Sequence, residues 1–281
     1  MVIRRHVHSV KPVYNLTMHK FATYAFSMRH PVRLFVYPSF CLWFLHGLSY
    51  LKWRLIDGSD VIKKGSQIVD SMLDSSIFER DILENISGAR LCSVVSEATT
   101  IALSKQLFSH YDVVIELARV SKFASGVTCG YDKPSRLGVD RWLAMVAAYN
   151  KHHQAVLVID AGSAVTLDVV DQNGFHLGGY ILPGTSLMVE SLRRGTKNVK
   201  VDVFDTQSLV PGKNTEDAAV NGILLSLIST IKTLTVSYPF KLVLSGGSAP
   251  AILKHLNMDV DYVPDLVLDG LSTPGVEFVS S

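Results

Sequence analysis

The stretch from Val156 to Gly184 constrains the fold most, because it contains three short apolar segments separated by tight turns. Residues 155–159 are too few for a helix and rich in β-branched side chains, which is typical of a buried strand. Residues 164–170 and 175–182 have the same character, and Asn173-Gly174 between them is a strong hairpin signal. The stretch therefore predicts three consecutive strands of a sheet.

The first of these strands ends on Asp160, and Ala161-Gly162-Ser163 follows as a tight turn. A carboxylate in this position can bind a metal ion or a hydrated cation that bridges to a phosphate. The turn amides and the Ser163 hydroxyl can then donate hydrogen bonds to the phosphate oxygens. The same residues could instead form a hairpin in which the aspartate caps its own turn. The residues alone leave both interpretations open.

The composition indicates a globular protein. A chain of 281 residues, of which 48% are hydrophobic, can bury one large core or two moderate ones. Its formal net charge of +2 is too small to imply a nucleic-acid partner. Cys41, Cys92 and Cys129 are far apart and lack the spacing of metal ligands. This use of cysteine fits a reducing cytoplasm, where we expect the protein to reside.

Residues 1–43 differ from the rest and are interpreted as an atypical N-terminal extension. No acidic residue precedes Asp57, and residues 34–51 are strongly apolar and aromatic. A membrane anchor or targeting segment is one interpretation, and a transit-like or spurious extension is another. Pro38 and His46 interrupt the apolar segment, so we expect no membrane-spanning helix and no membrane partner.

The remaining pattern alternates strands with helices. Further strands are expected at residues 50–56, 61–62, 89–96, 112–117, 241–244 and 260–263. Helices are expected at residues 71–86, 97–108, 141–150, 184–196, 215–236, 249–256 and 265–271, and residues 201–208 are expected to be mostly irregular. Two strand–hairpin–strand units, each followed by helices, predict two related α/β lobes at 44–136 and 137–281, with a ligand-binding cleft between them.

Seven motifs in a fixed order connect this chain to a known family. They are LKWRLIDG (51–58), CSVVSE (92–97), YDKPSRLGVDRWLAMVAA (131–148), DAGSAVTLD (160–168), GFHLGGYILPG (174–184), NTEDAAVNGI (214–223) and LSGG (244–247). Over about residues 47–272, the sequence resembles the type III pantothenate kinase family, also described as Bvg accessory factor-like proteins. The resemblance implies a two-lobed actin-like ATPase fold, shared with acetate and sugar kinases, heat-shock chaperone ATPases and actin.

The family's activity follows as an expectation. The resemblance implies ATP-dependent phosphorylation of pantothenate to 4′-phosphopantothenate, the first step of coenzyme A biosynthesis. It also implies Mg²⁺, a monovalent cation (K⁺ or NH₄⁺) and a homodimer that binds no nucleic acid.

The resemblance also assigns roles to individual residues. Asp140 matches the general base, and Asp160 matches the ligand of the monovalent cation. Other residues that match substrate-binding positions are Tyr131, Gly138, Val139, Arg141 and Thr215. Residues that match positions near ATP are Gly47, Ser49, Lys52, Ser163, Gly246 and Gly247.

The chemistry of Asp140 and Arg141 agrees with these roles. The dipole of a helix start favours a carboxylate, which predicts that Asp140 stays ionised at neutral pH. Arg141 could bind the carboxylate of pantothenate in a bidentate fork. The simpler alternatives are that Asp140 is a helix N-cap, that Arg141 forms a surface ion pair, and that Thr215 is a helix cap, a position that Asn214 could equally fill.

One motif departs from the family pattern. Where the family has D-x-G-N-T-x-x-K, this chain has Leu45-His46-Gly47-Leu48-Ser49-Tyr50-Leu51-Lys52. The leading aspartate would organise Mg²⁺ on the phosphates, and Leu45 cannot ligate a hard cation. A lost electrostatic contact of this kind typically costs roughly 2.7–4 kcal/mol of barrier.

Three explanations of this departure stay open. The chain is an active kinase with a compensating carboxylate, a non-catalytic descendant with a regulatory or accessory role, or a chain whose first 45 or so residues are an incorrect reading of the gene.

Overall fold

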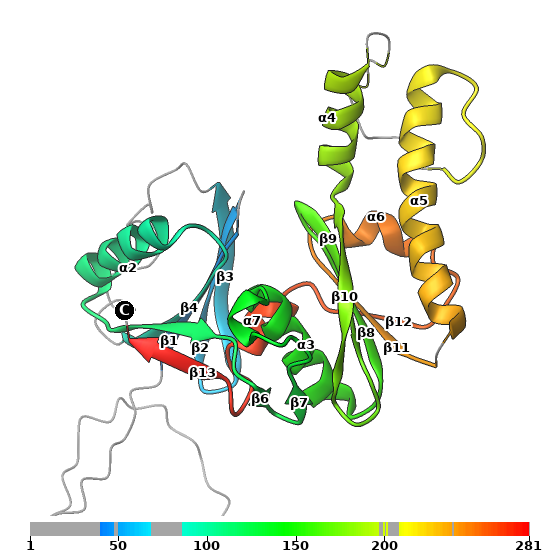
Figure 1. Cartoon of the computed structure of the whole chain (residues 1–281). Helices are drawn as coiled ribbons and strands as arrows, with labels where there is room; N and C mark the ends of the chain where they lie inside the picture. Colours follow the sequence, from blue (N-terminus) through cyan, green and yellow to red (C-terminus); the bar gives the residue numbers. More distant parts are fainter. Residues whose placement is uncertain are drawn as a thin grey trace, which may run out of the picture. The chain divides into compact units, whose positions relative to one another are not determined.

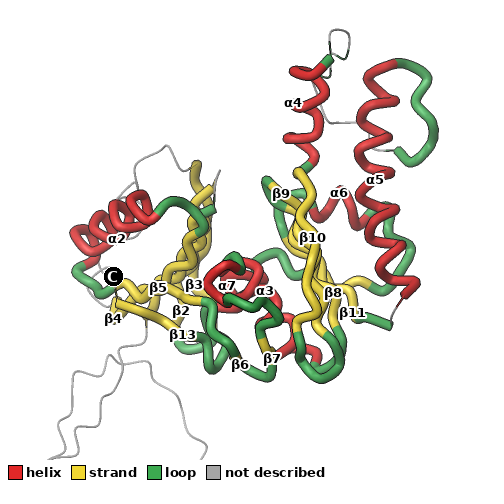
Figure 2. The backbone as a smooth tube through the Cα atoms, in the orientation of Figure 1, coloured by secondary structure: helices red, strands yellow, loops and turns green. Residues whose placement is uncertain are grey.

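The computed structural model describes residues 40–47, 50–68, 86–196, 199, 201, 208–237 and 239–280. Its strands form two main sheets, and helices pack against both (Figures 1 and 2). A further two-stranded ribbon is made by β6 (Phe123–Ala124) and β7 (Val127–Thr128).

The first sheet has six strands in the order β13-β5-β4-β1-β2-β3. The strands are β1 (Phe40–His46), β2 (Tyr50–Asp57), β3 (Asp60–Ile68), β4 (Ile86–Ser93), β5 (Ile115–Arg119) and β13 (Glu277–Ser280). β1 lies inside the sheet, antiparallel to β2 and parallel to β4. On one face, Phe44 and Leu91 pack with Leu103 and Leu107 of α2 (Glu97–Tyr111).

The second sheet has five strands in the order β10-β9-β8-β11-β12. The strands are β8 (Val156–Ala161), β9 (Ala164–Val170), β10 (His176–Pro183), β11 (Lys241–Ser245) and β12 (Val260–Tyr262). β8, β9 and β10 form an antiparallel meander, and β11 runs parallel to β8. One apolar cluster joins this sheet to α4 (Thr185–Gly195), α5 (Thr215–Ser237) and α6 (Ala249–Leu253).

A central helix, α3 (Val139–His152), contributes to a core that includes residues of both sheets. Trp142 and Met145 of α3 are fully buried in this core, together with Cys92 of β4 and Val158 of β8. The short helix α7 (Leu266–Gly270) packs against α3, and a Cβ at Gly270 would lie 2.6 Å from the Leu143 carbonyl oxygen. The glycine therefore permits the close approach of α7 to α3, the helix that carries Asp140.

Most expected elements are confirmed. The three strands of the 156–184 stretch are β8, β9 and β10, and the long helix expected at 215–236 is α5. The helix expected at 71–86 lies almost entirely outside the described residues, as do residues 202–207 of the irregular segment. The lobe boundary at 136/137 stays a prediction, while the pairing of β13 with β5 places residues 277–280 in the first sheet.

Four of the described strands were not expected, namely β1, β13 and the two short strands β6 and β7. Residues 40–46 belong to the apolar segment considered as a membrane anchor, but the structure has them as an internal strand. An apolar run that is covered on both faces reads the same in sequence whether it lies in a sheet or in lipid. Among the described helices, only α5 is long and apolar enough to cross a membrane, and 39% of its apolar window is buried in the protein.

Candidate active site

Asp140 and Arg141 lie in the first turn of α3, whose N-cap is Gly138. Asp140 is not the N-cap, because it is the second residue inside the helix, where its Oδ1 accepts a hydrogen bond from the backbone N–H of Arg141 at 2.8 Å. A Cβ at Gly138 would lie 2.6 Å from the same oxygen, so a glycine leaves room for the carboxylate. The interpretation of Asp140 as a plain N-cap is therefore wrong.

Burial has the largest effect on Asp140. It raises the pKa of this carboxyl above its usual value, while the backbone hydrogen bond and the positive charge of Arg141 lower it. The helix start alone predicted an easily ionised group, but desolvation outweighs that contribution. A buried carboxylate with a raised pKa is better suited to accept a proton than an exposed one.

Asp160 lies at the end of β8 and interacts electrostatically with Asp140. Burial, followed by the negative charge of Asp140, raises the pKa of Asp160 to about 6, and Lys52 on β2 acts in the opposite direction. Burial and the same two carboxylates also raise the pKa of the Cys92 thiol. Residues from β2, β4, α3 and β8 are thus brought into one electrostatic neighbourhood.

Leu45 stands in the row of side chains that adjoins this neighbourhood. Its partner on β2 is Lys52, and its partner on β4 is Cys92. Paired residues on adjacent strands point to the same face of a sheet, so Leu45 lies between Lys52 and Cys92. It packs against the core that contains Cys92. The row therefore carries an amine, an isobutyl group and a thiol, but no carboxylate.

The Ser-Gly-Gly loop after β11 lies directly against Asp160. Ser245 pairs with Asp160 across the two parallel strands, and the N–H of Ser248 donates to the Ala161 carbonyl at 2.9 Å. A Cβ at Gly246, whose φ is +94°, would lie 2.5 Å from Asp160 Oδ1. A glycine at position 246 can therefore adopt the positive φ and leaves room for the close approach of the Asp160 carboxylate.

A pocket of ≈ 280 Å³ begins at this loop. It is lined by Thr185, Ser186, Leu224, Gly247, Ser248, Ala251 and Ile252. Ser163 lies in the turn between β8 and β9. Its carbonyl accepts from the N–H of Gly184 at 3.1 Å, and the next residue, Thr185, lines the pocket. The loop and the turn supply backbone N–H groups and small side chains, which are suited to phosphate oxygens.

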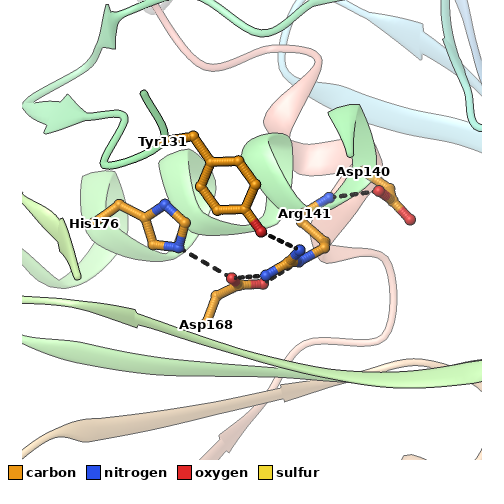
Figure 3. A network of polar contacts seen from close by, with 5 residues as sticks. All are labelled: Tyr131, Asp140, Arg141, Asp168 and His176. Carbon is orange, nitrogen blue, oxygen red and sulfur yellow. Dashed lines mark hydrogen bonds and ion pairs between the residues drawn. The ribbon is translucent and has the colours of Figure 1, made fainter. Parts of the chain in front are cut away.

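A buried polar network lies beside the start of α3 (Figure 3). Arg141 donates to Asp168 through Nε at 2.8 Å and through Nη2 at 2.5 Å, and Nη1 donates to the Tyr131 hydroxyl at 3.1 Å. His176 Nε2 lies 3.1 Å from Asp168 Oδ1, the oxygen that also accepts from Arg141 Nη2. The surface ion pair considered for Arg141 is therefore wrong, because its carboxylate partner is buried.

Tyr131 links this network to an open pocket of ≈ 620 Å³. The pocket is lined by Gly130, Tyr131, Asp132, Lys133 and Arg136. Of the residues expected to bind the substrate, Tyr131 alone lines this hollow, and the substrate-binding roles stay a prediction. Lys133 and Arg136 also line it, although they were not singled out from the sequence.

Three further residues were expected at the site, Thr215, Ser49 and Gly47. Thr215 is the exposed first residue of α5, and the cap of that helix is Asn214, whose Oδ1 accepts from the Asp217 N–H at 2.7 Å. The cap interpretation of Thr215 is therefore wrong, and its role in substrate binding stays a prediction. Ser49 lies outside the described residues, and Gly47 donates its N–H to the Tyr50 carbonyl at 3.1 Å.

Sequence reasoning missed Asp168 and His176. Asp168 is a single acid in the apolar run AVTLDVV of β9, and only 1% of it is exposed. A charged residue at a buried strand position requires a partner, which is the signal that could have pointed to it.

The two sheets with their flanking helices, and the acidic neighbourhood at the ends of β8 and α3, define a protein of the actin-like ATPase fold class. A crystal structure described as a Baf family transcriptional activator from Campylobacter jejuni is similar in fold, with a TM-score of 0.55 and 21% identity. That similarity covers 82% of this chain and 94% of the other.

The chain belongs to the type III pantothenate kinase family. The family model of that description matches residues 46–237. A type III pantothenate kinase from Pseudomonas putida is 36% identical over 238 residues, which cover 80% of this chain and 95% of that protein. One from Chromohalobacter salexigens is 36% identical over 244 residues, which cover 81% of this chain and 84% of that protein. The resemblance inferred from the seven motifs is confirmed.

Proposed function

We propose that this protein phosphorylates the terminal hydroxyl of pantothenate with ATP and thereby forms 4′-phosphopantothenate. Membership of the kinase family supports the reaction class. The observation that carries the proposal is the pair of buried carboxylates, Asp140 and Asp160: the charge of Asp140 acts on Asp160, and the positive charge of Lys52 acts on Asp160 in the opposite direction. Phosphoryl transfer needs a base for the hydroxyl and positive charge for the phosphates, and these residues supply both.

Asp140 is the general base of the proposed reaction. Its carboxylate accepts the hydroxyl proton while the hydroxyl oxygen forms a bond to the γ-phosphorus. The bond from that phosphorus to the β-phosphate oxygen breaks, and ADP leaves with the electron pair. The raised pKa of Asp140 brings the base closer to neutral pH, where general-base catalysis is most efficient.

On the nucleotide side, Lys52 and the backbone around Gly246 are the proposed phosphate contacts. Lys52 is close enough to Asp160 to lower its pKa, and Gly246 lies against the Asp160 carboxylate. Gly247 lines the adjoining pocket, which we assign to the rest of the nucleotide. Ser163 and Ser49 stay candidates for further phosphate contacts.

The donor set fits a cation at Asp160. Burial, followed by the negative charge of Asp140, raises the pKa of this carboxyl to about 6, so an added positive charge would stabilise its ionised form. A monovalent cation there would supply positive charge beside the phosphates. Mg²⁺ would arrive with ATP as part of the substrate. Leu45 offers Mg²⁺ no ligand, and the described residues contain no group of three or more His, Cys, Asp or Glu suited to a metal ion.

Replacing the base tests the proposal. The purified protein is incubated with ATP, Mg²⁺, K⁺ and pantothenate, and phosphopantothenate is measured by mass spectrometry. Asp140→Asn is expected to lower kcat by about 10²–10⁴-fold. Asp259→Asn removes a carboxylate that is exposed and paired with Lys241, so it serves as the matched control. Absence of product with the wild-type protein, or full activity of Asp140→Asn, would contradict the proposal.

Leu45 favours a second candidate function, a catalytically impaired family member that acts as a regulatory or accessory factor. The substrate loop and Asp140 are intact in this case, but the nucleotide side lacks an acid. Calorimetry with pantothenate and with Mg-ATP separately distinguishes the two. The impaired member is expected to bind pantothenate without converting it, and tight Mg-ATP binding would count against it.

We also propose that the protein is a cytoplasmic homodimer. β10 is an edge strand in the described sheet, and it exposes Tyr180 and Ile181 beside the exposed Leu187 of α4. An exposed edge with apolar side chains is a typical association surface. Light scattering on the purified protein should give twice the monomer mass of 30.9 kDa.

A further inference from the structure

We propose that Asp168 and His176 are positioning residues, which hold the Arg141 guanidinium in one orientation beside Tyr131 and the base Asp140. The inference rests on the proposed function, because that function gives the pocket at Tyr131 its substrate. It concerns two residues that act through Arg141 and do not themselves reach the substrate. Figure 3 shows the five side chains involved.

The Arg141–Asp168 pair is bidentate and withdrawn from water. The exposed fractions of the two side chains are 6% for Arg141 and 2% for Asp168. A buried guanidinium or carboxylate is stable as an ion only with a partner, and here each ion has one. Two parallel N–H···O contacts also fix the plane of the guanidinium, which a single contact would not do.

This geometry decides which edge of Arg141 is presented to a ligand. Nε and Nη2 are taken by Asp168, so they do not form a second fork for a substrate carboxylate. Nη1 contacts the hydroxyl of Tyr131, a residue that lines the open pocket. The hydroxyl accepts from Arg141, so its own hydrogen is directed to another acceptor. The donors beside the pocket are then Nη1 and the Tyr131 hydroxyl, and the expected grip of Arg141 on the carboxylate of pantothenate stays a prediction.

His176 supports both members of this arrangement. Its imidazole is fully buried, and its Nε2 lies 3.1 Å from Asp168 Oδ1. Since the neighbour is a carboxylate oxygen, Nε2 carries the hydrogen and donates it. The ring is also stacked on Tyr131, with 5.7 Å between the centroids and 11° between the planes. One histidine therefore orients the carboxylate and supports the aromatic ring.

Gly179 leaves the space that the ion pair occupies. This residue pairs with Asp168 across β9 and β10. A Cβ at Gly179 would lie 2.3 Å from Asp168 Oδ1 and 2.7 Å from Arg141 Nη2. The hairpin β9–β10 thus contributes Asp168, His176 and the space left by Gly179, next to Arg141 in the first turn of α3.

Two substitutions of His176 separate its contacts. His176→Gln keeps an N–H that can reach Asp168 but loses the ring, whereas His176→Phe keeps the ring but loses the donor. The first readout is the Arg141 Nε–H signal in ¹H–¹⁵N NMR, assigned by its loss in Arg141→Lys. In the wild-type protein it should exchange slowly with water. It should stay protected in His176→Gln and exchange roughly tenfold faster or more in His176→Phe, since a hydrogen bond to a charged group is lost.

The second readout is the Kd for pantothenate measured by calorimetry without ATP. His176→Phe should weaken binding about tenfold, and His176→Gln should restore most of it. Thermal melts monitor folding. A loss of affinity in His176→Phe but not in His176→Gln, without a matching difference in melting temperature, supports the positioning role. Equal Nε–H protection in the wild-type and His176→Phe proteins, or an equal loss in both variants, would overturn the inference.

The two readouts also separate this inference from the proposed function. If the wild-type protein binds no pantothenate, the proposed function fails, while the NMR comparison still decides whether His176 holds the Asp168–Arg141 pair. If the wild-type protein binds pantothenate and both variants bind it equally well, the positioning role fails and the proposed function stands.

Discussion

Asp160, the proposed cation ligand, lowers the stability of the folded protein when its carboxyl is ionised. Its carboxyl is buried near Asp140, and its pKa in the folded protein is about 6, compared with the ordinary 3.8. Between these two values the folded protein binds a proton that the unfolded chain has released. The free energy of unfolding therefore falls as the pH rises through this window, and at neutral pH the ionised group is destabilising.

We therefore predict that Asp160→Asn stabilises the protein. The shift of about two pKa units corresponds to at most roughly 3 kcal/mol at pH 7. Urea unfolding at pH 7 and at pH 4 measures the difference, which should shrink at the lower pH because the wild-type carboxyl is then protonated. A variant that is equally or less stable at pH 7 would show that the charge of Asp160 is compensated in the folded protein.

Leu45 is the second residue at which we predict a large effect of a single substitution, here on kcat/KM for Mg-ATP. It lies between Lys52 and Cys92, on the row next to the two carboxylates. We predict that Leu45→Asp raises kcat/KM for Mg-ATP by about 10²–10³-fold, the size of one preorganised electrostatic contact. Leu45→Asn is the matched control, since it has the same shape without the charge.

The measurement is steady-state turnover at saturating pantothenate, with a thermal melt of each variant. The melt is needed because Leu45 packs against the core and a carboxylate there is costly. A folded Leu45→Asp protein that is no more active than Leu45→Asn would show that the nucleotide side does not lack this acid.

At the scale of elements, β1 is the strand on which the first sheet depends. It pairs with β2 on one side and β4 on the other, and its Leu42 and Phe44 are fully buried. Its removal would leave two unpaired strand edges and an open core. A chain that starts at Tyr37 keeps the whole of β1, whereas a chain that starts at Gly47 lacks it.

We predict that a chain starting at Gly47 does not fold, whereas a chain starting at Tyr37 keeps the thermal transition of the full-length protein. Circular dichroism melts and near-ultraviolet spectra of the two truncations provide the test. A cooperative transition in the shorter chain would mean that β1 is dispensable for the sheet.

At the scale of the whole molecule, the site is assembled from residues far apart in sequence, and its charge depends on pH. Lys52, Asp140 and Asp160 come from β2, α3 and β8, and each affects the charge state of the site. When two such carboxylates interact, they titrate as a coupled pair. The unprotonated pair is the form that accepts a proton and attracts a cation.

We predict that kcat/KM falls as the pH decreases through about 6, because a carboxyl whose pKa is raised to that value takes up a proton below it. A pH–rate profile between pH 5 and 8, in buffers of constant ionic strength, records this acid limb. Lys52→Gln should move the limb to higher pH, since Lys52 lowers the pKa of Asp160. A profile that is flat down to pH 5 would contradict the coupling.

The sequence by itself determined the local features of this protein. The alternation and turns of residues 156–184 specify β8 to β10, because a strand pattern has a period of two residues and its turns have their own signals. The helix α5 and the position of Asp140 at the start of α3 were specified in the same way. Local propensity and periodicity are sufficient for such elements.

Only the tertiary structure decided how these elements meet. Residues 40–46 became a central strand because β2 and β4 pair with them, which no local pattern reports. The partner of Arg141 is Asp168, 27 residues further along the chain, and burial brings the two together. The raised pKa values of Asp140 and Asp160 depend first on desolvation and then on a nearby carboxylate, Asp168 for Asp140 and Asp140 for Asp160, and these are properties of the packed molecule.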